Sequence, residues 1–131
     1  MTVVRQRSDG DCGVAALASL TGIPYEDVYV EAVKIDKRHR GKNGLWNCQV
    51  IAIARRLGVR LSPTRTYDLD DDAGILRVRW NGSKAANNPG GHFIAIREGI
   101  IFCPALPTPM AWRHYLEMND GRACTLLKER V

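Results

Sequence analysis

Apolar residues recur with a helical period over the first half of the chain. Residues 12–20 are almost all small or apolar, and Gly22 then suits the left-handed position that ends a helix. A second helix is expected to begin at Pro24, because proline is tolerated in a first helical turn. A third is expected at about residues 47–57, before Gly58. The pattern thus predicts three helices ahead of the first strand.

The period changes to two after Gly58, which is typical of strands with one buried face. The expected strands are residues 59–61, 75–80, 92–97, 100–103 and 124–128, the last of them at an edge of the sheet. Glu98 and Gly99 are expected to form a tight hairpin turn, and a short helix is expected at residues 111–118. Helices followed by a mainly antiparallel sheet predict an α+β domain with the helices packed on one side of the sheet.

Length and composition fit an ordinary globular domain. The 131 residues suffice for one domain spanning residues 1–131, and their 45% hydrophobic and 25% charged content allows a single core without disulfides. The first residues turn polar too early for a signal peptide, and no apolar run approaches the roughly 20 residues that cross a bilayer. The sequence therefore predicts a cytoplasmic protein with no membrane segment.

Positive charge is concentrated in one stretch of the chain. The net charge is +5, and much of it lies in residues 34–42. One interpretation is a patch that binds nucleic acid or an acidic partner. However, no aromatic residue is interleaved there for base stacking, and cations are favoured near the C-terminus of the preceding helix. The pattern therefore favours a solvated loop over a nucleic-acid site.

The cysteines of the chain are Cys12, Cys48, Cys103 and Cys124. Their spacings are wide, and no pair has the two-residue gap of zinc ligands or redox motifs. Without a secretory signal, a disulfide framework is not expected either. We therefore expect no metal and no cofactor. Cys48 and Cys124 are expected to be buried, the first in the third helix and the second in a late strand.

Three residues indicate thiol chemistry. Cys12 stands at the start of a helix, where unpaired N–H groups and the helix dipole stabilise a thiolate. His92 opens a strand after a glycine-rich loop, a position from which an imidazole can reach the thiol as a base. Gln6 lies six positions before Cys12, and its neutral amide can donate to an oxyanion beside the backbone N–H of Cys12. Together they predict a Cys–His dyad with an oxyanion hole.

Three stretches resemble the bacteriocin-processing double-glycine leader peptidases, a family of papain-like cysteine peptidases. They are residues 6–20 (QRSDGDCGVAALASL), 44–61 (GLWNCQVIAIARRLGVRL) and 90–104 (GGHFIAIREGIIFCP). The first is similar to the family's active-site helix, the second to its following helix, and the third to its histidine strand and hairpin. The resemblance implies a papain-like fold, with Cys12 as nucleophile, His92 as base and Gln6 in the oxyanion hole.

One position departs from the pattern of that family. The return strand of the hairpin typically ends there in Asp-Pro, and the aspartate orients the histidine, whereas this chain has Cys103-Pro104. A neutral thiol is a poor acceptor and does not stabilise an imidazolium as a carboxylate does. Glu98 lies in the predicted turn, too far along the strand to replace the aspartate. The sequence therefore predicts a Cys–His dyad in which Cys103 takes the place of the third catalytic residue and supports the histidine only weakly.

Three functions fit this set of residues. The first is a peptidase acting on a peptide or protein, and the resemblance implies cleavage after small residues such as a Gly-Gly pair. The second is a catalytically weak or inactive module that binds a protein or peptide, including a host factor in a phage or mobile-element setting. The Cys103 departure favours this second function. The third is deamidation or acyl transfer by the same dyad. Reactivity of Cys12 that depends on His92 would separate the first function from the second.

Overall fold

The computed structural model describes residues 2–8, 10–36, 44–80 and 91–130, so residues 37–42 of the predicted basic loop lie outside the described part. The helices are α1 (Cys12–Thr21), α2 (Tyr25–Ile35), α3 (Asn47–Arg56) and α5 (Trp112–Met118). The strands are β1 (Arg60–Thr64), β2 (Gly74–Trp80), β3 (His92–Arg97), β4 (Ile100–Phe102), β5 (Met110–Ala111) and β6 (Gly121–Arg130). This is the α+β class predicted from the sequence. Within the described ranges, no helix is both long and apolar enough to cross a membrane.

Helix α1 begins and ends where the sequence predicts. Gly22 has a φ of 75°, which glycine adopts without steric cost, and its N–H donates to the carbonyl of Ala18 at 2.9 Å. Every residue from Cys12 to Leu20 is buried, so this helix has no solvent-exposed face. It packs against α2, α3, β2 and β3, and its small side chains allow this close approach on all sides. Helix α1 is therefore the centre of the helical layer.

The described strands form one antiparallel sheet in the order β1-β6-β2-β3-β4-β5. The expectation that residues 124–128 form an edge strand is wrong, because β6 pairs with β1 on one side and with β2 on the other. The consecutive residues Leu126 and Leu127 pack into hydrophobic cores on opposite faces of the sheet. A strand buried on both faces is typical of the interior of a sheet. Strands β1 and β5 are the edges instead.

Strand β2 approaches β6 most closely at Gly74. This glycine has a φ of 156°, and a Cβ atom built on it would lie 2.1 Å from the carbonyl oxygen of Leu127. Any other residue would have to push the two strands apart. The start of β2 therefore requires glycine.

The predicted hairpin between β3 and β4 is confirmed. Glu98 and Gly99 have φ values of 52° and 78°, and positive values at both central residues are typical of the type I′ turns that join twisted strands. The register pairs Arg97 with Ile100 and Ala95 with Phe102. This turn therefore determines which residues at the end of β4 come close to the start of β3.

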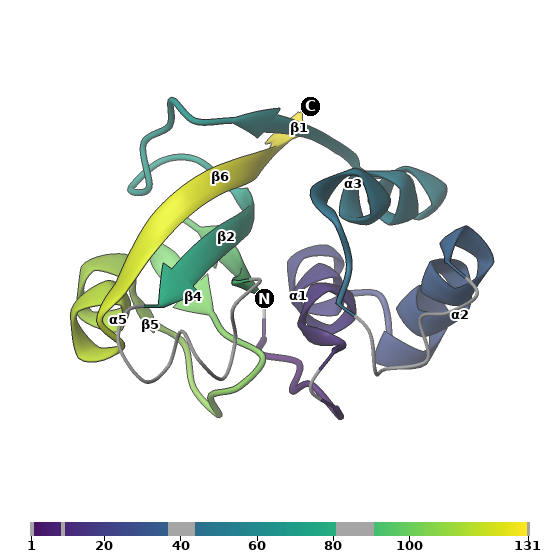
Figure 1. The fold of residues 1–131 in the computed structure, drawn as a ribbon, viewed down its shortest axis with the longest axis horizontal. Coiled ribbons are helices and arrows are strands. Elements are labelled where there is room, and N and C mark those ends of the chain that lie inside the picture. The colour runs from purple at the N-terminus through teal and green to yellow at the C-terminus, as the bar shows by residue number, and fades with distance from the viewer. Residues whose placement is uncertain (1, 9, 37–43, 81–90, 131) are drawn as a thin grey trace.

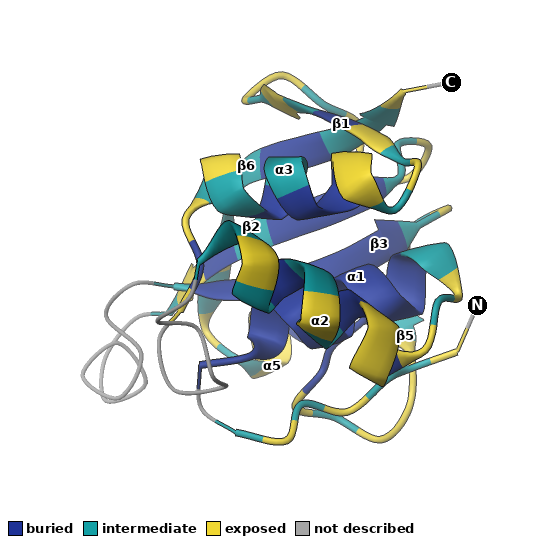
Figure 2. Ribbon diagram, turned by 90° about the vertical axis from the view of Figure 1, so that its right-hand side faces the viewer, coloured by how far each residue is buried: buried dark blue, intermediate teal, exposed yellow. Residues whose placement is uncertain are grey.

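Hydrophobic cores lie on both faces of the sheet. Helices α1, α2 and α3 cover one face (Figure 1), as predicted for the N-terminal helices, and Figure 2 shows their buried and exposed sides. Helix α5 covers the other face, so the expectation that the helices pack on one side is wrong for this helix. Its Tyr115 packs against a second set of apolar residues that includes Leu76 and Ile94. Both faces of β3 are apolar, and each is covered by helices.

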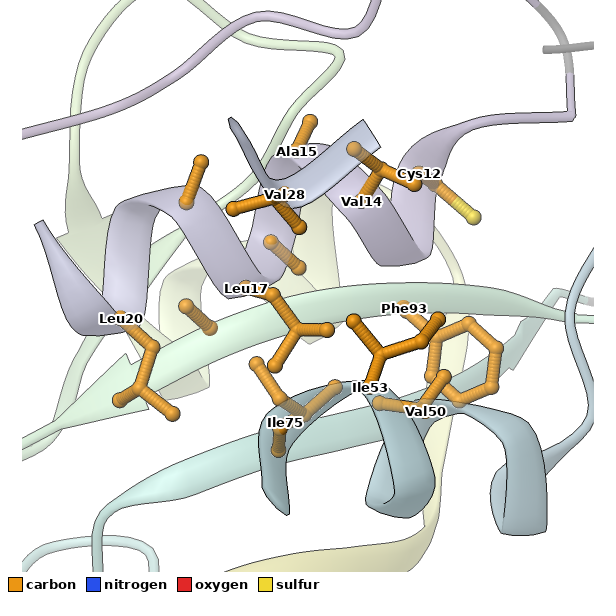
Figure 3. Close-up of a cluster of buried hydrophobic side chains, with 14 of the residues drawn as sticks. Cys12, Val14, Ala15, Leu17, Leu20, Val28, Val50, Ile53, Ile75 and Phe93 are labelled. Carbon is orange, nitrogen blue, oxygen red and sulfur yellow. The ribbon is translucent and has the colours of Figure 1, made fainter. Parts of the chain in front are cut away.

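The first core fixes the start of α1 against the sheet. Figure 3 shows Leu17 of α1 facing Ile53 of α3 and Ile75 of β2, with Phe93 of β3 near the end of α1 that carries Cys12. Leu17, Ile53 and Ile75 are fully buried. Fully buried apolar side chains of this size each contribute about 2 kcal/mol to folding. The position of Cys12 is therefore set by the core and not by a surface loop.

Candidate active site

The thiol of Cys12 lies where α1 and β3 both begin. Cys12 is the first residue of α1 and is 8% exposed. The backbone N–H groups of Phe93 and Gly13 lie close enough to its sulfur to lower the pKa of the thiol, so the sulfur is near the residue that follows His92. Residue 13 is tightly packed, because a Cβ atom there would lie 3.1 Å from Cδ1 of Leu45. The helix start and the strand start predicted from the sequence thus meet at this thiol.

The surroundings of Cys12 favour the neutral thiol in the resting protein. Burial raises its pKa above the usual value, and negative charge on Asp11 and Cys103 acts in the same direction. The N–H groups of Phe93 and Gly13 lower the pKa, but the effect of burial is larger. Formation of a thiolate therefore requires a base that takes the proton.

His92 is the candidate base, at the first position of β3. It is 5% exposed, and its ring packs on the indole of Trp80 with the ring centroids 5.8 Å apart. Nε2 of His92 lies 3.4 Å from Sγ of Cys103. Burial lowers the pKa of the imidazole to about 4, so the ring is neutral at pH 7. When Nε2–H donates to Cys103, Nδ1 is the nitrogen that can accept a proton.

The buried imidazole predicts a pH-dependent stability. The pKa of His92 is about 4 in the folded protein and about 6.5 in the unfolded chain. Between these values the unfolded chain binds a proton that the folded protein does not, so stability falls as the pH is lowered. We expect a loss of roughly 3 kcal/mol in the free energy of unfolding between pH 6.5 and pH 4. Urea unfolding at several pH values measures it.

The variant His92→Asn isolates this contribution, because every other titratable group is shared by the two proteins. Its free energy of unfolding should vary with pH less steeply than that of the wild-type protein over the same window. Equal slopes for the two proteins would show that His92 is protonated as easily in the fold as in the unfolded chain.

Cys103 lies on the same face of the sheet as His92, just after β4. The register of the hairpin places it diagonal to His92 across the strands. Tyr115 of α5 donates its hydroxyl hydrogen to Sγ of Cys103 at 3.2 Å. Burial raises the pKa of this thiol, while the Tyr115 hydroxyl and the N–H groups of Ala105 and Leu106 lower it. Several donors therefore surround position 103, an arrangement that suits a negatively charged acceptor.

Gln6 lies beside the end of β4. Its backbone N–H donates to the carbonyl of Pro104 at 2.9 Å, which holds the N-terminal segment against the residue that follows Cys103. Its Nε2 donates to the carbonyl of Ser8 at 2.9 Å. Its Oε1 is buried and has no hydrogen-bond partner among the described residues. The oxyanion role predicted for Gln6 therefore depends on the second hydrogen of its amide.

Asp11 fixes the loop between Gln6 and α1. It is fully buried, and its carboxylate accepts hydrogen bonds from the N–H groups of Arg7 (2.8 Å) and Ser8 (3.1 Å) and from the hydroxyl of Tyr25. It makes no side-chain bond to the N–H groups of α1. The sequence contains a signal for this role, because aspartates directly before helices often bind nearby backbone N–H groups. The path of the chain into Cys12 therefore depends on one carboxylate.

Replacing Asp11 with alanine should destabilise the protein by roughly 2–4 kcal/mol, because three donors lose a charged acceptor in a buried site. Urea unfolding measures the change. The control is Asp27→Ala, at an exposed position in the first turn of α2, where only a helix-dipole effect of about 0.3–1 kcal/mol is lost. Equal losses in the two variants would contradict a structural role for the Asp11 carboxylate.

The structure brings some of the predicted residues into contact and adds others. His92 contacts Cys103, and the sulfur of Cys12 contacts the backbone beside His92. Sequence reasoning did not identify Tyr115, because no local pattern places α5 over Cys103. Within the described residues, no group of three or more histidine, cysteine or acidic side chains is arranged to hold a metal ion.

The burial predicted for Cys48 is wrong, and Cys124 is only half-buried. Cys48 is exposed at the start of α3, because the buried face of that helix is formed by Val50, Ile53 and Ala54. Cys124 is half-buried on β6. All four thiols are free.

Comparison of the chain with models of known protein families and with curated proteins gave no match. The proposed function of the site is therefore argued from its own residues.

Proposed function

We propose that the protein has a papain-like fold and is a thiol hydrolase that cleaves peptide bonds, with Cys12 as nucleophile and His92 as base. The observation that carries the proposal is the contact between α1 and β3. The sulfur at the first position of a buried helix lies close enough to the N–H of Phe93, the direct neighbour of a buried histidine, for that N–H to lower the pKa of the thiol. The resemblance to double-glycine leader peptidases implies Cys12 and His92 as the same reacting pair.

The proposed reaction uses groups at the ends of these two elements. Nδ1 of neutral His92 takes the proton of Cys12, and the thiolate attacks the carbonyl carbon of the substrate. The backbone N–H of Cys12, at the helix start, and the second amide hydrogen of Gln6 donate to the oxyanion. His92 then gives its proton to the leaving amine, and water hydrolyses the thioester. Because its pKa is about 4, His92 is in the basic form at neutral pH.

A second candidate function is a peptidase-like module that binds a peptide or protein and does not turn it over. The observation that favours it is the contact between His92 and Cys103. A neutral thiol in that position stabilises an imidazolium poorly, and the loss of a carboxylate from a catalytic triad costs about 10⁴ in rate. The two candidates predict different chemistry at the Cys12 sulfur.

A peptide chloromethyl ketone ending in Gly-Gly tests the proposal, because it alkylates an activated thiol in a substrate-like position. The reaction is followed by mass spectrometry in a Cys48→Ser background, since Cys48 is exposed and would react by itself. We expect one adduct on Cys12 and a rate at least about tenfold lower in His92→Asn. Cys124 provides an internal reference in the same sample.

Three other results would each exclude the proposed reaction. Equal alkylation rates with and without His92 would show that the histidine does not activate the thiol. Binding of a Gly-Gly peptide without adduct or cleavage would favour the binding module. Conversion of an amide in the peptide to a carboxylic acid, with the backbone intact, would identify deamidation.

A further inference from the structure

A pocket of about 810 Å³ lies on the helical face of the sheet, and neither Cys12 nor His92 lines it. Its walls come from the start of α3, the connection between β1 and β2, and strands β2 and β6. Its lining includes four arginines, Arg65, Arg77, Arg79 and Arg122, and no carboxylate among the described residues. We call it the arginine pocket. Its size is within the range of sites for small molecules and cofactors.

The sheet places two of these arginines directly opposite each other. Arg79 of β2 and Arg122 of β6 are paired in register, and like charges at such positions destabilise a sheet. Burial lowers the pKa of Arg77, and the charge of Arg79 adds a smaller effect in the same direction. Arg60 and Arg130 form a similar pair at the other end of β6, but Asp72 lies close enough to Arg130 for their charges to interact. The pair in the pocket has no carboxylate in the lining to offset its repulsion.

The start of α3 adds to the positive potential of the pocket. Trp46 and Asn47, at the beginning of this helix, line the cavity. The first turn of α3 contains no acidic residue, whereas the first turn of α2 contains Glu26 and Asp27. The side chain of Gln49 accepts the N–H of Trp46, but no acidic side chain in the first turn offsets the positive end of the dipole of α3, and such ends attract anions.

The pocket also offers groups that a simple anion does not use. Trp46 is 68% exposed, and its indole is a surface on which a planar ring can stack. Tyr67 lies in the same lining, and its hydroxyl is fixed by a 2.7 Å hydrogen bond to the carbonyl of Cys124. A matching ligand carries negative charge and a planar ring.

We infer that the arginine pocket binds a nucleotide unit, with phosphate on Arg79 and Arg122 and the base on Trp46. Arginine forks bind phosphate in a bidentate manner, and the exposed indole provides the base-stacking surface that residues 34–42 lack. An acidic peptide would satisfy the arginines but would leave the indole without a partner. The source of the unit is either a free nucleotide or single-stranded nucleic acid.

The variant Arg79→Glu separates binding from stability. We expect it to weaken binding of a fluorescein-labelled oligothymidylate, measured by anisotropy at low salt, by about tenfold or more. Its Tm should stay the same or rise, because the new carboxylate faces Arg122 in register. The matched control is Arg60→Glu, which makes the same charge change opposite Arg130 outside the pocket. It should change the affinity by less than about twofold, as expected for a charge outside the site.

A second variant and four competitors identify the ligand. Trp46→Ala should weaken binding of the oligonucleotide and of ATP by about tenfold and leave competition by pyrophosphate unchanged. ATP competing as well as an unlabelled oligonucleotide would identify a free nucleotide as the source, whereas a much tighter oligonucleotide would identify a single strand. The inference is wrong if oligoglutamate competes as strongly as ATP, if Arg79→Glu and Arg60→Glu weaken binding equally, or if neither nucleotide ligand binds.

Discussion

Replacing Cys103 with aspartate is expected to accelerate alkylation of Cys12 at neutral pH by roughly 10- to 100-fold, because it supplies the negatively charged acceptor that orients a catalytic histidine. Nε2 of His92 already lies 3.4 Å from the sulfur at this position. The hydroxyl of Tyr115 already donates to it, and the N–H groups of Ala105 and Leu106 are close enough to lower the pKa of the thiol. A carboxylate would therefore find its donors in place. The same substitution should raise the pKa of His92 from about 4, because an adjacent negative charge favours the imidazolium.

Two measurements follow this change in parallel. An NMR titration of the ring protons gives the pKa of His92, and mass spectrometry gives the rate of Cys12 alkylation. The matched control is Cys103→Asn, which has nearly the same shape as aspartate without its charge. If the asparagine and aspartate variants have the same His92 pKa and the same alkylation rate, position 103 does not act on the histidine through charge.

Replacing Gly74 with alanine is expected to destabilise the protein by about 4 kcal/mol or more, a loss typical of forced overpacking with backbone strain. The new Cβ atom would lie 2.1 Å from the carbonyl oxygen of Leu127, and the φ of 156° is one that L-residues rarely adopt. No flexible side chain can move to relieve this contact, since the atom it meets belongs to the backbone of β6. The interior of the sheet must separate locally.

Gly44→Ala is the control for this prediction. Apart from its chain neighbours, no atom of the described residues lies within 4 Å of a Cβ built at Gly44, so the free energy of unfolding should change by less than about 0.5 kcal/mol. Urea unfolding compares the two variants when both are soluble. An insoluble Gly74→Ala variant beside a soluble Gly44→Ala variant supports the same conclusion, whereas equal stability would show that β2 and β6 can move apart at little cost.

The parts of the fold that the sequence predicts correctly are those determined locally. Helix α1 is a run of small and apolar residues ended by Gly22, and the β3–β4 hairpin contains Glu98 and Gly99 at its turn. Each of these signals acts within a few residues of the structure it determines. The start of a helix at Cys12 and of a strand at His92 could therefore be predicted without knowledge of the tertiary structure.

The errors concern which elements are neighbours in space. The position of β6 depends on pairing with β1 and β2, about 40 to 70 residues earlier in the chain, and only the adjacent Leu126 and Leu127 indicate that both faces of this strand are covered. Helix α5 is too short for its pattern to show which face of the sheet it covers. The exposure of Cys48 depends in the same way on how α3 is rotated against the core.

The candidate site likewise has some features that local sequence signals predict and others that depend on tertiary contacts. The order of Gln6, Cys12 and His92 along the chain could be read from motifs, and the resemblance to the leader peptidases implied that Cys103 stands where an aspartate would orient His92. The contact from Tyr115 to Cys103 joins α5 to the end of β4, and no motif in the sequence signals it. The arginine pocket gathers residues from three separate parts of the chain, so its charge cannot be recognised as one cluster before the chain is folded.

The interior position of β6 has a consequence for synthesis on the ribosome. Strands β1 and β2 are made early, but the strand that joins them, residues 121–130, follows every other described element. Until it emerges, β1 has no partner strand, and the edge of β2 that β6 will cover is open to pairing with other chains. The sheet can therefore close only after its last strand has been translated, and a nascent chain that stalls before residue 121 should need a chaperone to remain soluble.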